Sequence, residues 1–213
     1  MRDNPFSDAF LFVIGSTQDH DSLGGLKWLL VALFLLLVAG SLWIAWRNLT
    51  LDPQQGSAGT VATFVCRLMI GCMWFQGSLW KLPLPRSGGF EYWTGQMGEH
   101  AAFAFHRELV KAVYLPWLDV IDPLVFLAEL AFAVSLMLGI GVRFFALLAV
   151  PYCLHLWLGL YRHPAEWPWN YIFLAMVHVW FVVDAAGRSL GLDALLRRRP
   201  ATGFAGRLVA AVG

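Results

Sequence analysis

Three ionisable side chains interrupt long apolar stretches of the sequence, where an unpaired charge is costly. Glu129, His155 and His178 each lie within a run of about 20 mostly apolar residues. A carboxylate or an imidazole at such a position binds a ligand, carries a proton, or joins two helices through a hydrogen bond. We take these three residues as the candidate catalytic groups, with simple helix packing as the alternative.

A further apolar stretch, residues 63–82, carries a cation near each end. Arg67 and Lys81 lie roughly 20 Å apart if the stretch is helical. Helical spacing places five residues on one stripe of this helix: Arg67, Gly71, Trp74, Ser78 and Lys81. Because a cation inside a membrane needs a partner, we expect the stripe to face other helices and not lipid.

The composition is typical of a membrane protein. Of the 213 residues, 59% are hydrophobic and 14% are charged, whereas soluble domains carry about 25% charged residues. The apolar runs are continuous and do not alternate with polar residues, which favours helices over a β-barrel. A net charge of +1 gives no indication of nucleic-acid binding.

These features predict an all-α polytopic membrane protein. We expect five membrane-spanning helices at about 26–46, 60–82, 120–140, 143–161 and 169–186. The last four form a four-helix bundle in a domain covering 60–195, and the first is an additional helix within an N-terminal region, 1–59. An extracytoplasmic segment, 86–118, contains an amphipathic stretch near 98–115 that we expect on the membrane surface. Residues 196–213 form a basic tail.

The positions of lysine and arginine predict the orientation of the chain. On one side of the expected spans lie Arg47, Arg67, Arg143, Arg188 and the run 197–199. On the other side lie Lys81, Arg86, Arg107, Lys111 and Arg162, mostly in or beside the long segment, where charges count less toward orientation. Cytoplasmic loops carry an excess of these residues. We therefore place the C-terminus in the cytoplasm, with the N-terminus and the long segment outside.

This topology places the three candidate catalytic groups at a similar depth. Glu129, His155 and His178 lie roughly 15, 10 and 14 Å from the outer surface at 1.5 Å per residue. Lys81 lies above them, so the four side chains can converge on the axis of the bundle. Near the inner surface, Arg67 and Asp184 could form a second pair.

Several ligands were weighed for such a site. Two histidines and a carboxylate resemble a metal triad in type, but they come from separate helices without short-range ligand spacing, and we predict neither metal nor haem. A quinone fits better, because it is lipid-soluble, accepts hydrogen bonds at its carbonyls and stacks on aromatic rings. Trp74, Lys81 and Tyr152 are the candidate quinone-binding residues.

Residues of fixed spacing recur in the second span: Arg67, Gly71, Phe75, Gly77 and Lys81. The third span adds Glu129, Gly139 and Arg143, and the closing segment, 187–193, ends in Ser-Leu-Gly-Leu-Asp. Through these residues the sequence resembles the DoxX/DoxD-like membrane protein family over residues 60–195, with one extra glycine in the closing segment. The resemblance implies a four-helix core in a bacterial cytoplasmic (inner) membrane.

The resemblance also implies a function, because the family includes the small subunit of a thiosulfate:quinone oxidoreductase. The expected protein is a membrane subunit of a quinone-linked oxidoreductase, surrounded by lipid and assembled with partner subunits or further copies of itself. Basic residues at the outer mouth could attract an anion such as thiosulfate: Lys81, Arg86, Arg107 and Lys111. The alternative is a non-catalytic accessory or scaffold subunit of a larger membrane complex, so enzymatic activity is left open.

Overall fold

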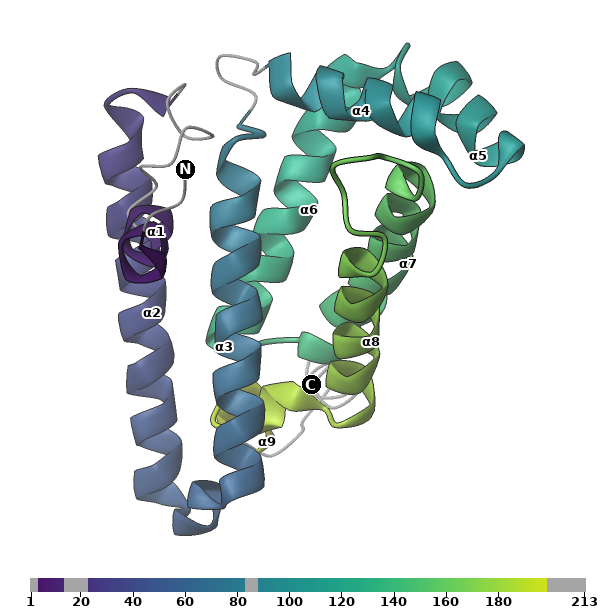
Figure 1. The fold of residues 1–213 in the computed structure, drawn as a ribbon. Coiled ribbons are helices and arrows are strands. Elements are labelled where there is room, and N and C mark those ends of the chain that lie inside the picture. The colour runs from purple at the N-terminus through teal and green to yellow at the C-terminus, as the bar shows by residue number, and fades with distance from the viewer. Residues whose placement is uncertain (1–3, 14–22, 83–87, 199–213) are drawn as a thin grey trace.

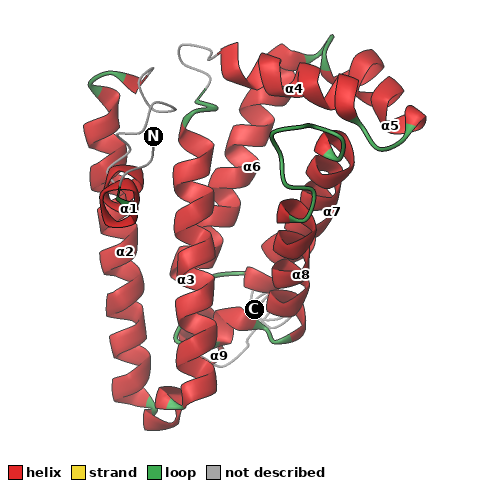
Figure 2. Ribbon diagram, in the orientation of Figure 1, coloured by secondary structure: helices red, strands yellow, loops and turns green. Residues whose placement is uncertain are grey.

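The computed structural model describes residues 4–13, 23–82 and 88–198, and within these ranges it is helical without strands (Figures 1 and 2). The helices are α1 (Pro5–Val13), α2 (Leu26–Leu51), η2 (Pro53–Gly56), α3 (Ala58–Leu79), α4 (Gly88–His100), α5 (Ala104–Leu109), η3 (Val110–Tyr114), α6 (Leu118–Leu138), α7 (Val142–Leu160), α8 (Asn170–Val183), η4 (Ala186–Arg188) and α9 (Leu192–Arg197). The all-α class expected from the sequence is confirmed.

Four of these helices, α2, α3, α6 and α7, are long and apolar enough to cross a membrane. The fifth expected span, 169–186, is not confirmed. Its helix, α8, has 14 residues and is therefore roughly 21 Å long, whereas the hydrocarbon core of a bilayer is about 30 Å thick. The chain preceding α8, residues 161–169, is a loop and not a helix.

The long helices stand side by side, and shorter helices close both ends (Figure 1). The closest pairs are α3 with α6 and α7 with α8. At the upper end of Figure 1, α4 and α5 lie across the tops of the upright helices, and α9 lies at the lower end. The N-terminal helix α1, which the sequence did not predict, crosses in front of α2 in this view.

The polar stripe of α3 is buried, as its spacing predicts. Arg67 and Ser78 have no exposed surface, and Trp74 is 5% exposed. At Gly71 an added Cβ would lie 2.8 Å from Cγ of Met137 and 2.9 Å from its backbone nitrogen. The absence of a side chain at this position therefore allows α3 and α6 to approach closely.

Arg67 binds backbone carbonyls and not the carboxylate that we expected. Its Nη1 donates to the carbonyl oxygens of Leu136 and Met137, and its Nη2 donates to that of Ser189 at 3.3 Å. The predicted pairing with Asp184 is wrong, because Asp184 accepts from the Thr63 hydroxyl at 3.2 Å. The last carbonyls of a helix have no partner within it, so those of α6 attract the guanidinium.

The segment before α9 folds back against the turn between α6 and α7. The carboxylate of Asp193 accepts from the backbone nitrogens of Gly141 at 2.8 Å and Val142 at 3.3 Å, which caps the first turn of α7. Gly139 ends α6 in the left-handed region, with φ 69°. An added Cβ at Gly191 would lie 2.9 Å from Cα of Gly139, so the extra glycine of this segment is what lets the two backbones touch.

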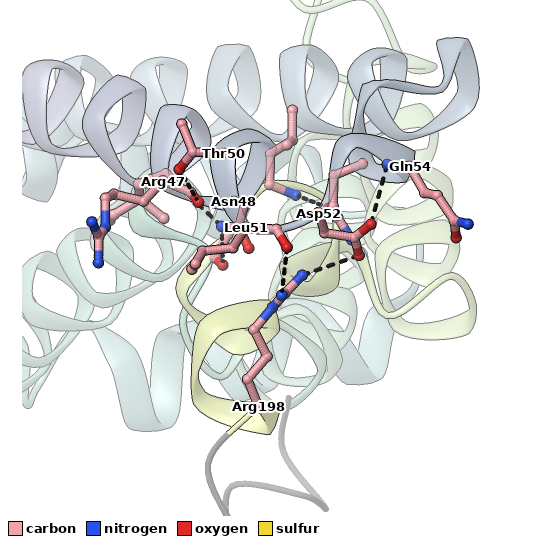
Figure 3. Close-up of polar contacts among 11 residues, drawn as sticks. Arg47, Asn48, Thr50, Leu51, Asp52, Gln54 and Arg198 are labelled. Atoms are coloured by element: carbon pink, nitrogen blue, oxygen red, sulfur yellow. Dashed lines mark hydrogen bonds and ion pairs between the residues drawn. The ribbon is translucent and has the colours of Figure 1, made fainter.

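The same end of the molecule anchors the junction between α2 and α3 (Figure 3). Arg198 donates from Nη1 to the carbonyl of Leu51 at 3.2 Å and from Nη2 to Oδ2 of Asp52 at 3.0 Å. The other oxygen of Asp52 accepts from the backbone nitrogen of Gln54 at 3.1 Å. Most of the predicted basic tail, from residue 199 onward, lies outside the described residues.

The extramembrane segment has a different shape from the single amphipathic stretch expected near 98–115. Helix α4 ends at His100, and a new helix, α5, begins at Ala104 and continues into η3, a π-helical turn. Between them the backbone nitrogen of Ala102 donates to the carbonyl of Leu158 in α7 at 2.8 Å. This bond across the interface takes the place of a helical one, so the segment bends here.

The contact at Gly71 can be tested by replacing it with alanine. We expect Gly71→Ala to lower the free energy of unfolding by about 1–3 kcal/mol, because its Cβ would force α3 and α6 apart. The measurement is circular dichroism during a denaturing-detergent titration. Gly77→Ala is the matched control on the same helix, since an added Cβ there meets nothing within 4 Å. Equal effects of the two substitutions would contradict close packing at Gly71.

Candidate functional site

A cavity of about 900 Å³ opens beneath α4, between α3, α7 and α8. Most of its wall is apolar and rich in aromatic rings, including Trp74, Trp80 and Trp93. Its polar lining residues come from six different segments of the chain: Lys81, Thr94, Glu129, Tyr152, Glu166, Asn170 and Tyr171. The cavity therefore combines a large apolar surface with a small set of polar groups, as ligand sites commonly do.

The centre of the polar group is an ion pair between Lys81 and Glu129. The Lys81 ammonium nitrogen lies 2.6 Å from each carboxylate oxygen of Glu129. The Glu129 side chain is 1% exposed and that of Lys81 is 13% exposed. The hydroxyl of Tyr152 donates a further hydrogen bond to Oε1 of Glu129. Residues from α6, α7 and the end of α3 thus meet at one carboxylate.

This cluster places acid–base groups beside an apolar cavity. Glu129 is partnered by a cation and a hydroxyl, which removes much of the cost of a carboxylate at this depth. An ammonium group has three donors; two are directed at Glu129 and the third at the carbonyl of Gly77 at 3.5 Å, a long bond that a ligand oxygen could replace. The cluster can therefore hold a polar ligand group and exchange a proton with it.

His178 is joined to this wall through Trp74. The indole Nε1 of Trp74 donates to Nε2 of His178 at 3.1 Å, and Nδ1 of His178 lies 2.8 Å from the carbonyl of Leu174. Since Nε2 accepts, Nδ1 carries the proton and donates it to Leu174, which defines a neutral tautomer. The Trp74 ring in turn lies 5.8 Å from that of Tyr152. His178 is fully buried and positions Trp74, which itself lines the cavity.

His155 lies elsewhere, on the wall of a second cavity of about 510 Å³ between α4, α6 and α7. Its Nδ1 lies 2.9 Å from Nε2 of His106 in α5, and the ring of Tyr114 stacks on it at 4.7 Å. Among the three candidate catalytic residues, Glu129 and His178 are therefore linked through Trp74 and Tyr152, whereas His155 is paired with a different group.

The sequence did not single out His106 or Tyr114. Both lie in the extramembrane segment, whose polar composition indicated a surface helix, yet His106 is 3% exposed. Burial lowers the pKa of His106 and raises the pKa of Tyr114. Their spacing of eight residues in the sequence places them near one helical face. This spacing is the one sequence signal that could have indicated that both contact the same residue.

For a metal ion or a small anion, the described residues offer fewer binding groups. Within the described residues there is no group of three or more His, Cys, Asp or Glu side chains that could hold a metal ion. Of the four basic residues expected to attract an anion, Lys81 is paired with Glu129, and Arg86 lies outside the described residues. Arg107 and Lys111 lie on the α5 and η3 arm.

No protein-family model, curated protein or solved structure matches the chain. The resemblance to the DoxX/DoxD-like family therefore remains a prediction from the residues that carry it.

The ion pair can be tested by a double-mutant cycle. Glu129→Leu should lower the free energy of unfolding by about 3 kcal/mol, because it leaves the Lys81 ammonium without its carboxylate. The double variant Lys81→Met with Glu129→Leu should lose less than the single variant, since no charge is then left alone. Arg198→Met is the control at an exposed pair, with an expected loss of about 0–1 kcal/mol. If the double variant lost as much free energy of unfolding as Lys81→Met and Glu129→Leu lose together, the two side chains would not interact.

Proposed function

We propose that the chain is a membrane subunit of a quinone-linked oxidoreductase and that the 900 Å³ cavity is its quinone site. The observation that carries the proposal is the position of the Lys81–Glu129–Tyr152 cluster at the wall of a large aromatic cavity. Sites for small organic ligands have volumes of about 300–1,000 Å³ and combine apolar walls with a few polar groups.

The lining residues have the chemical groups that a quinone needs. A bound quinone accepts two electrons and two protons and becomes a quinol. Lys81 can donate a hydrogen bond to a ring carbonyl, and Glu129 can supply a proton to the same oxygen. Trp80 and Trp93 offer ring faces for stacking within the same cavity. His178 holds Trp74 in its orientation through the bond between Nε1 and Nε2.

The cavity also suits a ligand that arrives through lipid. Its walls include Met73 and Gly77 of α3 and Phe173 and Val177 of α8. Phe173 is 49% exposed on the outer surface of the molecule. If α8 with the preceding loop completes a fifth span, the space between α3 and α8 faces the bilayer. A lipid-soluble quinone could enter there without crossing water.

The proposed orientation places the α4 and α5 end outside a bacterial cytoplasmic membrane and the C-terminus inside. The arginines of the opposite end lie beside helix ends or in short connections: Arg47, Arg143, Arg188, Arg197 and Arg198. The lysines and arginines of the α4 and α5 end lie mostly in or beside the long extramembrane segment, where they count less toward orientation: Lys27, Lys81, Arg107, Lys111 and Arg162. An excess of arginine and lysine is typical of the cytoplasmic face. The extramembrane arm then lies on the side from which an extracytoplasmic electron donor would approach.

The electrons would come from a reduced donor, for which we propose thiosulfate. Two thiosulfate ions joined to one tetrathionate ion release two electrons, which with two protons reduce one quinone to quinol. Arg107 and Lys111 on the arm would attract such an anion. The donor reaction itself would take place on a partner subunit or across copies of this chain.

The proposed function can be tested on protein purified in mild detergent from its native membrane. We expect quinone to be retained with the wild-type chain, alone or with a small redox partner. Glu129→Gln should keep the fold and reduce thiosulfate-dependent reduction of a short-chain quinone by about 10²-fold or more, because the proton donor is lost. Glu99→Gln, an exposed acid on α4, is the matched control and should leave the rate unchanged.

Two results would contradict this function. Unchanged turnover in Glu129→Gln would remove Glu129 from the mechanism. A large complex that carries its own cofactors, with no quinone on this chain, would instead support the accessory or scaffold role. The exposed face of α2 favours that alternative, because Trp28, Leu36 and Trp43 are each more than half exposed and could contact another subunit as well as lipid.

A further inference from the structure

A buried histidine, His106, and a half-buried one, His155, contact each other outside the proposed quinone cavity. Nε2 of His106 in α5 lies 2.9 Å from Nδ1 of His155 in α7, and the ring centroids are 4.8 Å apart. Each imidazole has one nitrogen that donates and one that accepts when it is neutral. The pair therefore forms a row of four nitrogens along which a proton can move by a change of tautomers.

The local backbone holds this pair in place. The ring of Tyr114 stacks on that of His155 with an angle of 21° between their planes. Tyr114 is brought there by the π-helical turn η3, which is closed by a bond of 2.9 Å from the nitrogen of Leu115 to the carbonyl of Val110. Single π-helical turns often occur at functional sites, because they redirect side chains that an α-helix would place elsewhere.

The outer end of the row is a nitrogen that lacks a partner. Nδ1 of His106 is buried and accepts or donates no hydrogen bond within the described part of the chain. A buried imidazole nitrogen normally binds a protein group or a water molecule. Because α5 belongs to the extramembrane arm, that water would connect the pair with the outer solution. Burial lowers the pKa of His106, so the ring is neutral near pH 7 and can pass a proton without retaining it.

The inner end of the row faces the route to Glu129. His155 and Tyr152 both line the second cavity, and they lie one helical turn apart on α7, so their side chains are neighbours. The Tyr152 hydroxyl donates to Glu129. A cavity of about 510 Å³ has room for several water molecules, each of which occupies roughly 30 Å³ in the liquid.

We propose that His106, His155 and Tyr152 form a proton relay between the outer surface and Glu129. The inference rests on the proposed function, because quinone reduction consumes protons and Glu129 must be reprotonated after each transfer. A proton binds Nδ1 of His106, the proton on Nε2 moves to Nδ1 of His155, and Nε2 of His155 releases one to cavity water. Tyr152 accepts that proton as it passes its own to Glu129. Only N–H and O–H bonds change, and no electrons move.

Several ionisable groups face this route. Tyr114 lies against His155, and Lys81, Cys153 and Tyr171 face Glu129 from the end of α3, from α7 and from α8. Cys153 lies between Tyr152 and His155 in the sequence of α7, but it is fully buried in the hydrophobic core and does not line the second cavity. Tyr152 also lines the larger cavity, so the relay predicts that replacing either histidine slows proton access to Tyr152 without abolishing it.

The relay can be tested in protein without quinone, through exchange of the Tyr152 hydroxyl proton with D₂O. Infrared spectroscopy of protein with ring-labelled tyrosine would follow the exchange, and Tyr152→Phe would identify the band. His155→Gln and His106→Gln keep a hydrogen-bonding side chain but cannot shuttle a proton between two ring nitrogens. We expect each to slow the exchange about tenfold or more. His163→Asn, a buried histidine away from the pair, should exchange at the wild-type rate.

Wild-type exchange in both glutamine variants would overturn the relay and leave the pair a structural contact. Slow exchange in both, with a normal rate in His163→Asn, would support it. The result does not depend on quinone. If the chain binds no quinone, the proposed function fails while the exchange measurement still decides whether the relay exists. If quinone binds, the glutamine variants should also slow turnover while leaving the affinity for quinone unchanged.

Discussion

The fold depends on partners for two cations, Arg67 within α3 and Lys81 just beyond its end. Arg67 is fully buried and satisfies the carbonyls that end α6 together with the carbonyl of Ser189. Without these oxygens the guanidinium would have no place at this depth, since a buried charge is tolerated only when it is paired. The requirement joins α3, α6 and the segment before α9 at one point, and Asp193 extends the junction to the first turn of α7.

Just beyond the other end of α3, Lys81 has a different kind of partner from Arg67. Lys81 meets a carboxylate and not carbonyls, and this carboxylate also accepts from Tyr152. Carbonyl partners carry no proton to transfer, whereas a carboxyl group and a hydroxyl group can take part in proton transfer. Arg67 therefore has a structural role. Lys81 lies beside a cavity, in a cluster of groups that can take part in proton transfer. Glycines and aromatic residues lie between Arg67 and Lys81 in the sequence.

Sequence patterns predicted the features that depend on local spacing. The buried stripe of α3 follows from helical periodicity, and the end of α6 follows from Gly139, whose left-handed conformation suits glycine. The partners of Arg67 could not be predicted, because backbone carbonyls at a helix end are not visible in a list of residue types. Nor could the pairing of His106 with His155, because it requires the bend at Ala102 that docks the extramembrane arm on α7.

That docked arm links the two cavities. Phe90, Thr94 and Met97 of α4 line both of them, so α4 is a shared wall as well as a roof. The arm packs closely on α7, because an added Cβ at Gly159 would lie 3.0 Å from Cγ of Met97. The backbone bond from Ala102 to Leu158 and that from Arg162 to His100 fix it further. A ligand in the larger cavity would therefore contact residues that also line the smaller one, which joins the Glu129 cluster to the histidine pair through α4.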